Sequence, residues 1–249
     1  MISEVSAGPA RHPEWEAGWP YSASVAHYVV PYRDSGDDGE ELRYSLRTVQ
    51  TNLKPQDDLR VLVVGDCPSW YQGEYLKTHP RGEKQRDIIS NVLAATIQLK
   101  GGEFIYASDD YFLMEPVDRV LNHHYAPLQA HIAQRKRAKD PYVRVLEDTQ
   151  RYLIGVPEAL SWELHRPMRV VANDWTVLCL SRLYDWATTR QASPSWRTVY
   201  GVLSGVRSTL KIRDGKSAGS VTGLDWISSD GEVPDFIREK FSESSKWER

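Results

Sequence analysis

The stretch Phe104-Ile105-Tyr106-Ala107-Ser108-Asp109-Asp110 decides the fold, because an apolar run of strand length ends there in two adjacent acids. Adjacent carboxylates repel each other, and this repulsion is costly unless a cation lies nearby. Carboxylate oxygens suit Mg²⁺ or Mn²⁺, which commonly bridge a carboxylate and the phosphates of a substrate. The stretch therefore predicts either a site for a divalent metal ion and a diphosphate, or a solvated turn after a strand.

Two strands and two helices are expected to alternate ahead of this stretch. Residues 25–30 and 59–64 are β-branched, apolar runs of strand length, and residues 40–52 and 86–100 carry apolar side chains at helical spacing. This alternation predicts a parallel, doubly wound α/β sheet, in which ligands bind at the carboxyl ends of the strands. We interpret the polar residues 67–83 as one long functional loop.

The remainder of the chain is less regular. An extended arm is expected over residues 1–24, before the first strand, and a basic, Gly- and Ser-rich segment covers residues 205–223. Helices are expected over 126–138, 142–154, 173–190 and, at the end of the chain, 233–241.

Composition argues against several classes of protein. The chain has 249 residues and 31 basic against 34 acidic side chains, so no strong field attracts nucleic acid. No apolar run reaches the ~18 residues of a membrane span, and the first residues lack the features of a signal peptide. Cys67 and Cys179 match no zinc spacing and are expected to be free thiols of a cytoplasmic protein. Glycine-rich nucleotide loops and a nucleophile elbow are missing too, which disfavours triphosphatases, nicotinamide enzymes and α/β hydrolases.

Three other motifs carry candidate chemistry. His165 lies between Glu163 and Arg166 and is either a metal ligand or a loop histidine, and the residues alone do not favour it over His124. The run 82–87 begins a helix, and its cations and backbone amides either attract phosphate or are ordinary helix-start composition. A basic loop is either a lid over a diphosphate or a solvated segment, and its cations are Lys211, Arg213 and Lys216.

Several runs resemble known transferases. YVVPYR (28–33), LRYSLRTV (42–49) and VLVVGDCPSW (61–70) resemble the core of Stealth-type capsule sugar-phosphate transferases and of GT-A-like glycosyltransferases of actinobacterial phages. In both groups an acid pair follows a strand that ends in an aromatic residue, as here. Further runs that resemble downstream motifs of these groups are 163–168, 197–201, 228–230 and 237–241, so that the likeness covers about residues 25–247.

The resemblance implies a GT-A fold, which is a Rossmann-like, mixed and mostly parallel sheet flanked by helices, with a helical C-terminal acceptor-side region. One domain, 25–249, would hold a nucleotide-sugar-binding half (25–116) and an acceptor half (117–249). Ser108 stands where many GT-A enzymes carry the first acid of an Asp-x-Asp motif. The implied metal ligands are Asp109, which could instead contact the ribose, Asp110 and His165. The implied donor contacts are Lys84 and Asp87, with Tyr32 and Arg33 beside the nucleotide base.

The expected activity is transfer of a hexose from a UDP- or GDP-type nucleotide sugar to a hydroxyl of a glycan or protein, assisted by Mn²⁺ or Mg²⁺. An inverting course needs a carboxylate base, for which the candidates are Glu163, Asp174 and Asp230. Two alternatives stay open: a Stealth-type sugar-1-phosphate transferase, and a non-catalytic glycan- or protein-binding module on a GT-A core. A phage origin would place the protein in the host cytoplasm.

Overall fold

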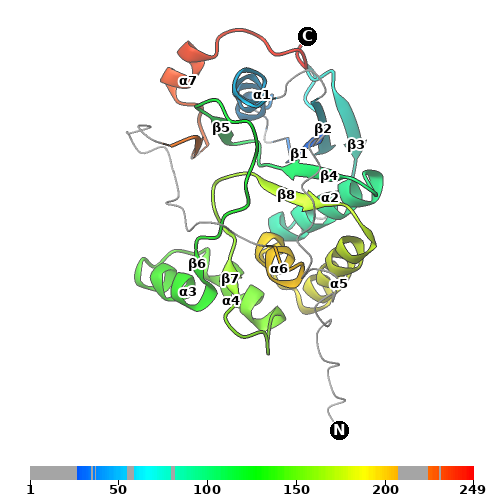
Figure 1. Ribbon diagram of the computed structural model, residues 1–249, viewed down its shortest axis with the longest axis vertical. Helices are drawn as coiled ribbons and strands as arrows, with labels where there is room; N and C mark the ends of the chain where they lie inside the picture. The colour runs from blue at the N-terminus through cyan, green and yellow to red at the C-terminus, as the bar shows by residue number, and fades with distance from the viewer. Residues whose placement is uncertain are drawn as a thin grey trace.

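The computed structural model describes residues 27–34, 36, 38–54, 59–79, 82–206, 224–229 and 231–249. Its central sheet has five strands in the order β3-β2-β1-β4-β8 (Figure 1). Four of them are parallel, and β8 runs antiparallel to β4. The predicted α/β class with a mixed, mostly parallel sheet is therefore confirmed. The strands are β1 (His27–Tyr32), β2 (Arg60–Gly65), β3 (Glu74–Lys77), β4 (Glu103–Tyr106) and β8 (Met168–Val171).

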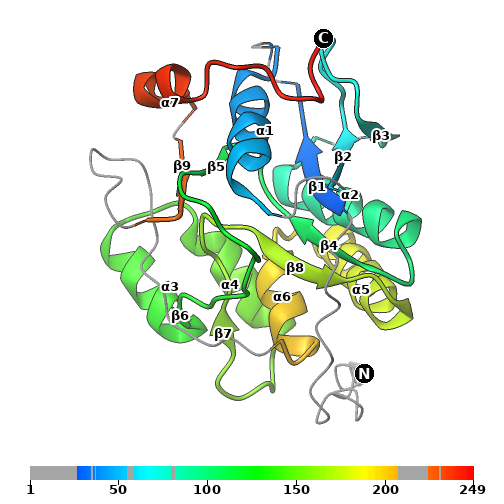
Figure 2. The same cartoon turned by 45° about the horizontal axis from the view of Figure 1, so that its top comes forward.

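Helices cover both faces of the sheet (Figure 2). Alternate residues of a strand point to opposite faces, so Val29 of β1 faces one core while Tyr28 and Val30 face the other. The core that contains Val29 is closed by α2 (Lys84–Gln98), α5 (Asp174–Arg190) and α6 (Trp196–Leu203). The opposite core is closed by α1 (Glu40–Asn52). The sheet is thus the middle of three layers, which explains the nearly continuous apolar runs of β1 and β2.

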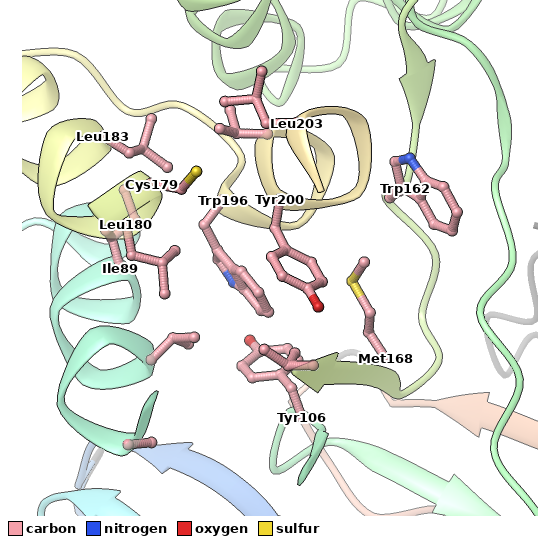
Figure 3. Close-up of a cluster of buried hydrophobic side chains, with 14 of the residues drawn as sticks. Ile89, Tyr106, Trp162, Met168, Cys179, Leu180, Leu183, Trp196, Tyr200 and Leu203 are labelled. Atoms are coloured by element: carbon pink, nitrogen blue, oxygen red, sulfur yellow. The ribbon is translucent and has the colours of Figure 1, made fainter. Parts of the chain in front are cut away.

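Aromatic packing holds α6 against the end of β4. Figure 3 shows the side chains of Trp196 and Tyr200 pointing toward Tyr106, and the ring centroids of Tyr106 and Trp196 are 4.6 Å apart. The Tyr200 hydroxyl accepts a 2.9 Å hydrogen bond from the backbone N–H of Val171, in β8. Because Tyr106 ends β4, these contacts fix α6 beside the turn that carries the acid pair.

Shorter elements complete the structure: β5 (Tyr111–Leu113) pairs with β9 (Trp226–Ser228), and β6 (Ala126–Pro127) pairs with β7 (Leu160–Ser161). Polar side chains of α1 anchor β5. Ser45 donates to the Tyr111 carbonyl at 2.7 Å, and Asn52 donates to the Leu113 carbonyl at 2.7 Å. The last three helices are α3 (Leu128–Arg137), α4 (Val143–Tyr152) and α7 (Asp235–Lys240).

The helix predicted over 40–52 is confirmed at both ends, and the other predicted helices and strands are found with shifted bounds. The prediction of one loop over 67–83 is wrong, because Glu74–Lys77 forms the edge strand β3, which pairs with β2. β8 was not expected at all. Cys67 and Cys179 are free, as predicted. Within the described ranges, no helix is long and apolar enough to cross a membrane. The arm predicted over 1–24 lies outside the described residues, as does most of the basic segment.

Candidate functional site

The acid pair occupies a tight turn at the carboxyl end of β4. The backbone N–H of Ala107 donates to the Val29 carbonyl at 3.0 Å and so continues the ladder between β4 and β1. The chain then turns at Asp109 and Asp110 and enters β5 at Tyr111. Both acids are half-buried. The pair therefore lies at the carboxyl ends of the parallel strands, which is where α/β proteins bind ligands.

Burial and mutual repulsion disfavour the charged form of both acids. Burial raises the pKa of Asp109 to about 7, and the charges of Asp110 and Glu41 add to the rise, while Lys84 opposes it. Burial likewise raises the pKa of Asp110 to about 6, with help from Glu41 and against His165 and Lys84. These influences mean that Lys84, His165 and Glu41 all lie within electrostatic reach of the pair. Two predicted site residues, Lys84 and His165, therefore influence the acid pair through their charge.

Glu41 is a member of the site that sequence reasoning missed. It lies in the first turn of α1, and its carboxylate accepts a hydrogen bond from the Ser229 hydroxyl. The backbone N–H of Ser229 donates to the Asp110 carbonyl at 3.2 Å, so Ser229 links the two acids. A signal was present, because a helix that follows a parallel strand begins at the carboxyl edge of the sheet, and this helix begins with acids.

Lys84 is the first residue of α2 and is exposed. The helix start is organised by Glu83, whose carboxylate accepts from the backbone N–H groups of Gln85 and Arg86. Asp87 is buried and accepts a 3.1 Å hydrogen bond from the N–H of Gly82. Asp87 therefore has a role in the turn before α2, and its predicted contact with a donor nucleotide stays a prediction.

Tyr32 and Arg33 lie at the carboxyl end of β1, on the same edge of the sheet as the acid pair. Tyr32 is buried against Gly39, which has a φ of 67°, and Arg33 is exposed. The Tyr32 carbonyl accepts a 3.0 Å hydrogen bond from the N–H of Asp66, at the end of β2. Both residues thus lie at the same end of the parallel strands as the acid pair, and their contact with a nucleotide base stays a prediction.

The segment around His165 is held by a buried arginine. Arg197, on α6, donates to the carbonyl of Leu164 at 2.6 Å and to the carbonyl of Arg166 at 2.7 Å. Arg166 in turn pairs with Asp225, which directly precedes β9. His165 is thereby presented from a fixed backbone rather than from a loose loop.

The three candidate bases have different surroundings. Both carboxylate oxygens of Glu163 accept hydrogen bonds, one from the Tyr142 hydroxyl at 2.6 Å and one from the Ser195 hydroxyl.

Asp174 is 85% exposed and pairs with Lys100 at 2.6 Å. Asp174 is the first residue of α5, which follows β8. Because β8 is antiparallel to β4, its last residue pairs with the first residue of β4. Asp174, one of the three candidates for the base, therefore lies at the end of the sheet opposite the acid pair. The candidates that lie outside the described residues are Asp230, Lys211, Arg213 and Lys216.

The predicted metal ligands are not assembled into a ready-made cage. Among the residues that the structure describes, no three His, Cys, Asp or Glu side chains are close enough to hold a metal ion. Asp109 and Asp110 nevertheless offer hard oxygen donors. Burial and repulsion between negative charges make it costly for these two side chains to ionise. Mg²⁺ is typically held by one or two carboxylates together with substrate phosphates, and this pair fits that arrangement.

No protein-family model matches this chain, and no curated protein matches it either.

Proposed function

We propose that this chain is a metal-assisted glycosyltransferase of the GT-A type, which moves a hexose from a nucleotide-diphosphate sugar to a hydroxyl group. The observation that carries the proposal is the acid pair Asp109-Asp110 at the carboxyl end of β4, with Lys84 and His165 in electrostatic reach. Acids whose charged form is disfavoured in the free protein are costly for the fold, and such groups are concentrated at functional sites.

The sheet gives independent support. The strand order 3-2-1-4-8, with four parallel strands and an antiparallel fifth, places the ends of β1, β2 and β4 at one edge. Lys84 adds a cation at this edge, at the first position of α2, where the helix dipole also attracts anions. A diphosphate with a nucleoside on one side and a sugar on the other suits an edge that combines acids, a lysine and a histidine.

Each residue of the site has a proposed role. Asp109 and Asp110 would hold Mg²⁺ or Mn²⁺ together with the phosphates of the donor. His165 is the candidate for a further ligand, although among the described residues it does not form a three-ligand cluster with the two acids. When bound, the ion supplies positive charge that offsets the charge developing on the diphosphate. Lys84 binds a phosphate oxygen, and Ser229 keeps Glu41 turned toward the backbone of Asp110. Glu163 is a weaker candidate for the base than expected, because both its oxygens already accept hydrogen bonds.

The product distinguishes this proposal from its alternatives. The purified chain would be incubated with a panel of UDP- and GDP-sugars and Mn²⁺, with water as the hydroxyl acceptor of the sugar, and the released nucleotide identified by chromatography. Release of nucleoside diphosphate by the wild type and by Asp174→Asn, but not by Asp110→Asn, supports the proposal. Release of nucleoside monophosphate would replace it with sugar-1-phosphate transfer. Release of neither, from a folded protein across the panel, would favour a binding module.

A further inference from the structure

The guanidinium of Arg197 joins the two parts of the candidate site. Its side chain is buried, with the residue 6% exposed, on the helix that packs against Tyr106. One of its terminal nitrogens donates to the hydroxyl of Tyr111 at 2.9 Å and to the carbonyl of Leu164 at 2.6 Å. The other donates to the carbonyl of Arg166 at 2.7 Å. Tyr111 directly follows Asp110, so a single side chain contacts both the acid-pair turn and the histidine segment.

The acceptors of Arg197 lie on either side of His165. The carbonyls of Leu164 and Arg166 flank that residue, and fixing both defines the backbone from which the imidazole projects. The Tyr111 hydroxyl also donates to the Leu164 carbonyl, at 3.2 Å. The planar fork of a guanidinium reaches two carbonyls at once, whereas the single ammonium of a lysine does not reproduce that geometry.

The surroundings of Arg197 accommodate a buried cation. The three hydrogen-bond acceptors of its guanidinium are neutral groups. Burial acts against the cation, but Tyr111 and Glu163 favour it, and the pKa of Arg197 is raised overall. The guanidinium carbon also lies 5.9 Å from the centre of the Tyr106 ring. What Arg197 adds beyond its charge is therefore the fork of hydrogen bonds on either side of His165.

We infer that Arg197 is a positioning residue, which fixes His165 relative to the turn that carries Asp109 and Asp110. The inference rests on the proposed function, because that function gives His165 its role. It adds that Arg197 is the residue that holds His165 in position. Arg197 touches neither metal nor substrate in this scheme, and it acts through the backbone on both sides of His165.

The test compares Arg197→Lys with Arg169→Lys. Arg169 is a matched control, because it too is a buried arginine. It lies in β8, and its guanidinium pairs with Glu103, at the end of β4 away from the acid pair. The first readout is the ring signal of His165 in spectra of ¹³C-labelled histidine, assigned among the seven histidines with His165→Gln. We expect the His165 signal to shift in Arg197→Lys and to stay in place in Arg169→Lys. A His165 signal unchanged by Arg197→Lys would overturn the inference.

The second readout is a double-mutant cycle on turnover. We expect Arg197→Lys to lower kcat by roughly 10- to 100-fold, the range typical of groups that orient a metal ligand. The double variant with His165→Gln should be no slower than His165→Gln alone, because Arg197 acts through His165. Losses that multiply would contradict the inference. Should Arg197→Lys not fold, Tyr111→Phe removes one acceptor of Arg197 and is expected to shift the same signal.

The two proposals fail separately. A wild-type protein without transferase activity on any donor would remove the proposed function, yet the histidine spectra would still show whether Arg197 sets the position of His165. Normal activity in Arg197→Lys, with an unmoved His165 signal, would leave the proposed function standing and remove the role of Arg197.

Discussion

The carboxyl group of Asp110 lies within electrostatic reach of Glu41, which belongs to a different element and a distant part of the sequence. The pKa of Asp110 rises to about 6, first because the group is buried and then because Glu41 is negative. Ser229 connects the two residues through its hydroxyl and its backbone N–H. Acids gathered in this way have a cost in the free protein that a bound cation would remove.

Replacing Asp109 by Asn is expected to stabilise the protein at alkaline pH. The pKa of Asp109 is about 7 in the folded chain, against an ordinary value of 3.8. Between these values the folded state keeps a proton that the unfolded state has lost, so stability falls as pH rises through this window and is level above it. At about pH 8 we expect Asp109→Asn to gain about 1–2 kcal/mol, after allowance for solvent screening.

Urea unfolding at about pH 4.5 and about pH 8 checks this prediction, because the gain should be largely absent at the lower pH. Asp174→Asn is the matched control, since Asp174 is exposed and pairs with Lys100 away from the site. An Asp109→Asn protein that is less stable than the wild type at alkaline pH would contradict the account.

Glu163→Gln separates a structural role from a catalytic one. The carboxylate of Glu163 accepts from Tyr142 and Ser195, and the amide of Gln offers only one oxygen to these two hydroxyls. We expect the variant to lose about 1–3 kcal/mol of stability, the cost of an unsatisfied buried partner. Thermal unfolding and kcat should be measured together. Unchanged stability with a loss of kcat above about 100-fold would instead identify Glu163 as the general base.

Gly201→Ala is expected to disturb the packing of Trp162. A Cβ atom at Gly201 would lie 2.4 Å from the indole nitrogen of Trp162, which is buried in the core that supports Glu163. At that distance either α6 or the indole must shift, so we expect a loss of about 1–3 kcal/mol, typical of overpacking. Gly102→Ala is the control, because the nearest atom to its added Cβ is 3.6 Å away. Equal melting temperatures for both variants would show that α6 is less tightly packed than described.

The sequence predicted the parallel part of the sheet well because its strands are buried on both faces. β1 and β2 are nearly continuous apolar runs, and the helix 40–52 has a clear helical spacing of Leu42, Leu46 and Val49. β3 escaped prediction because it is an edge strand whose residues are mostly exposed and polar. β8 escaped because four residues at the end of a candidate motif carry too little pattern, and only pairing with β4 defines them as a strand.

The candidate site was predictable only in part. Asp109 and Asp110 were found because they end a strand, but Glu41 depends on how α1 packs beside β5. The contacts of Arg197 could not be predicted, since its acceptors are two backbone carbonyls and the Tyr111 hydroxyl, all distant in sequence. The position of Asp174 could not be predicted, because sequence order does not reveal that β8 runs antiparallel. The start of α5 therefore lies at the end of the sheet opposite the acid pair.

The most direct test of the account is calorimetric titration of a nucleoside diphosphate into the wild type and into Asp110→Asn, each with and without Mn²⁺. The account predicts binding that requires Mn²⁺, that is lost in Asp110→Asn and that persists in the control Asp174→Asn. Binding of equal strength with and without Mn²⁺, or binding unchanged in Asp110→Asn, would contradict the assignment of the acid pair to a metal-diphosphate site.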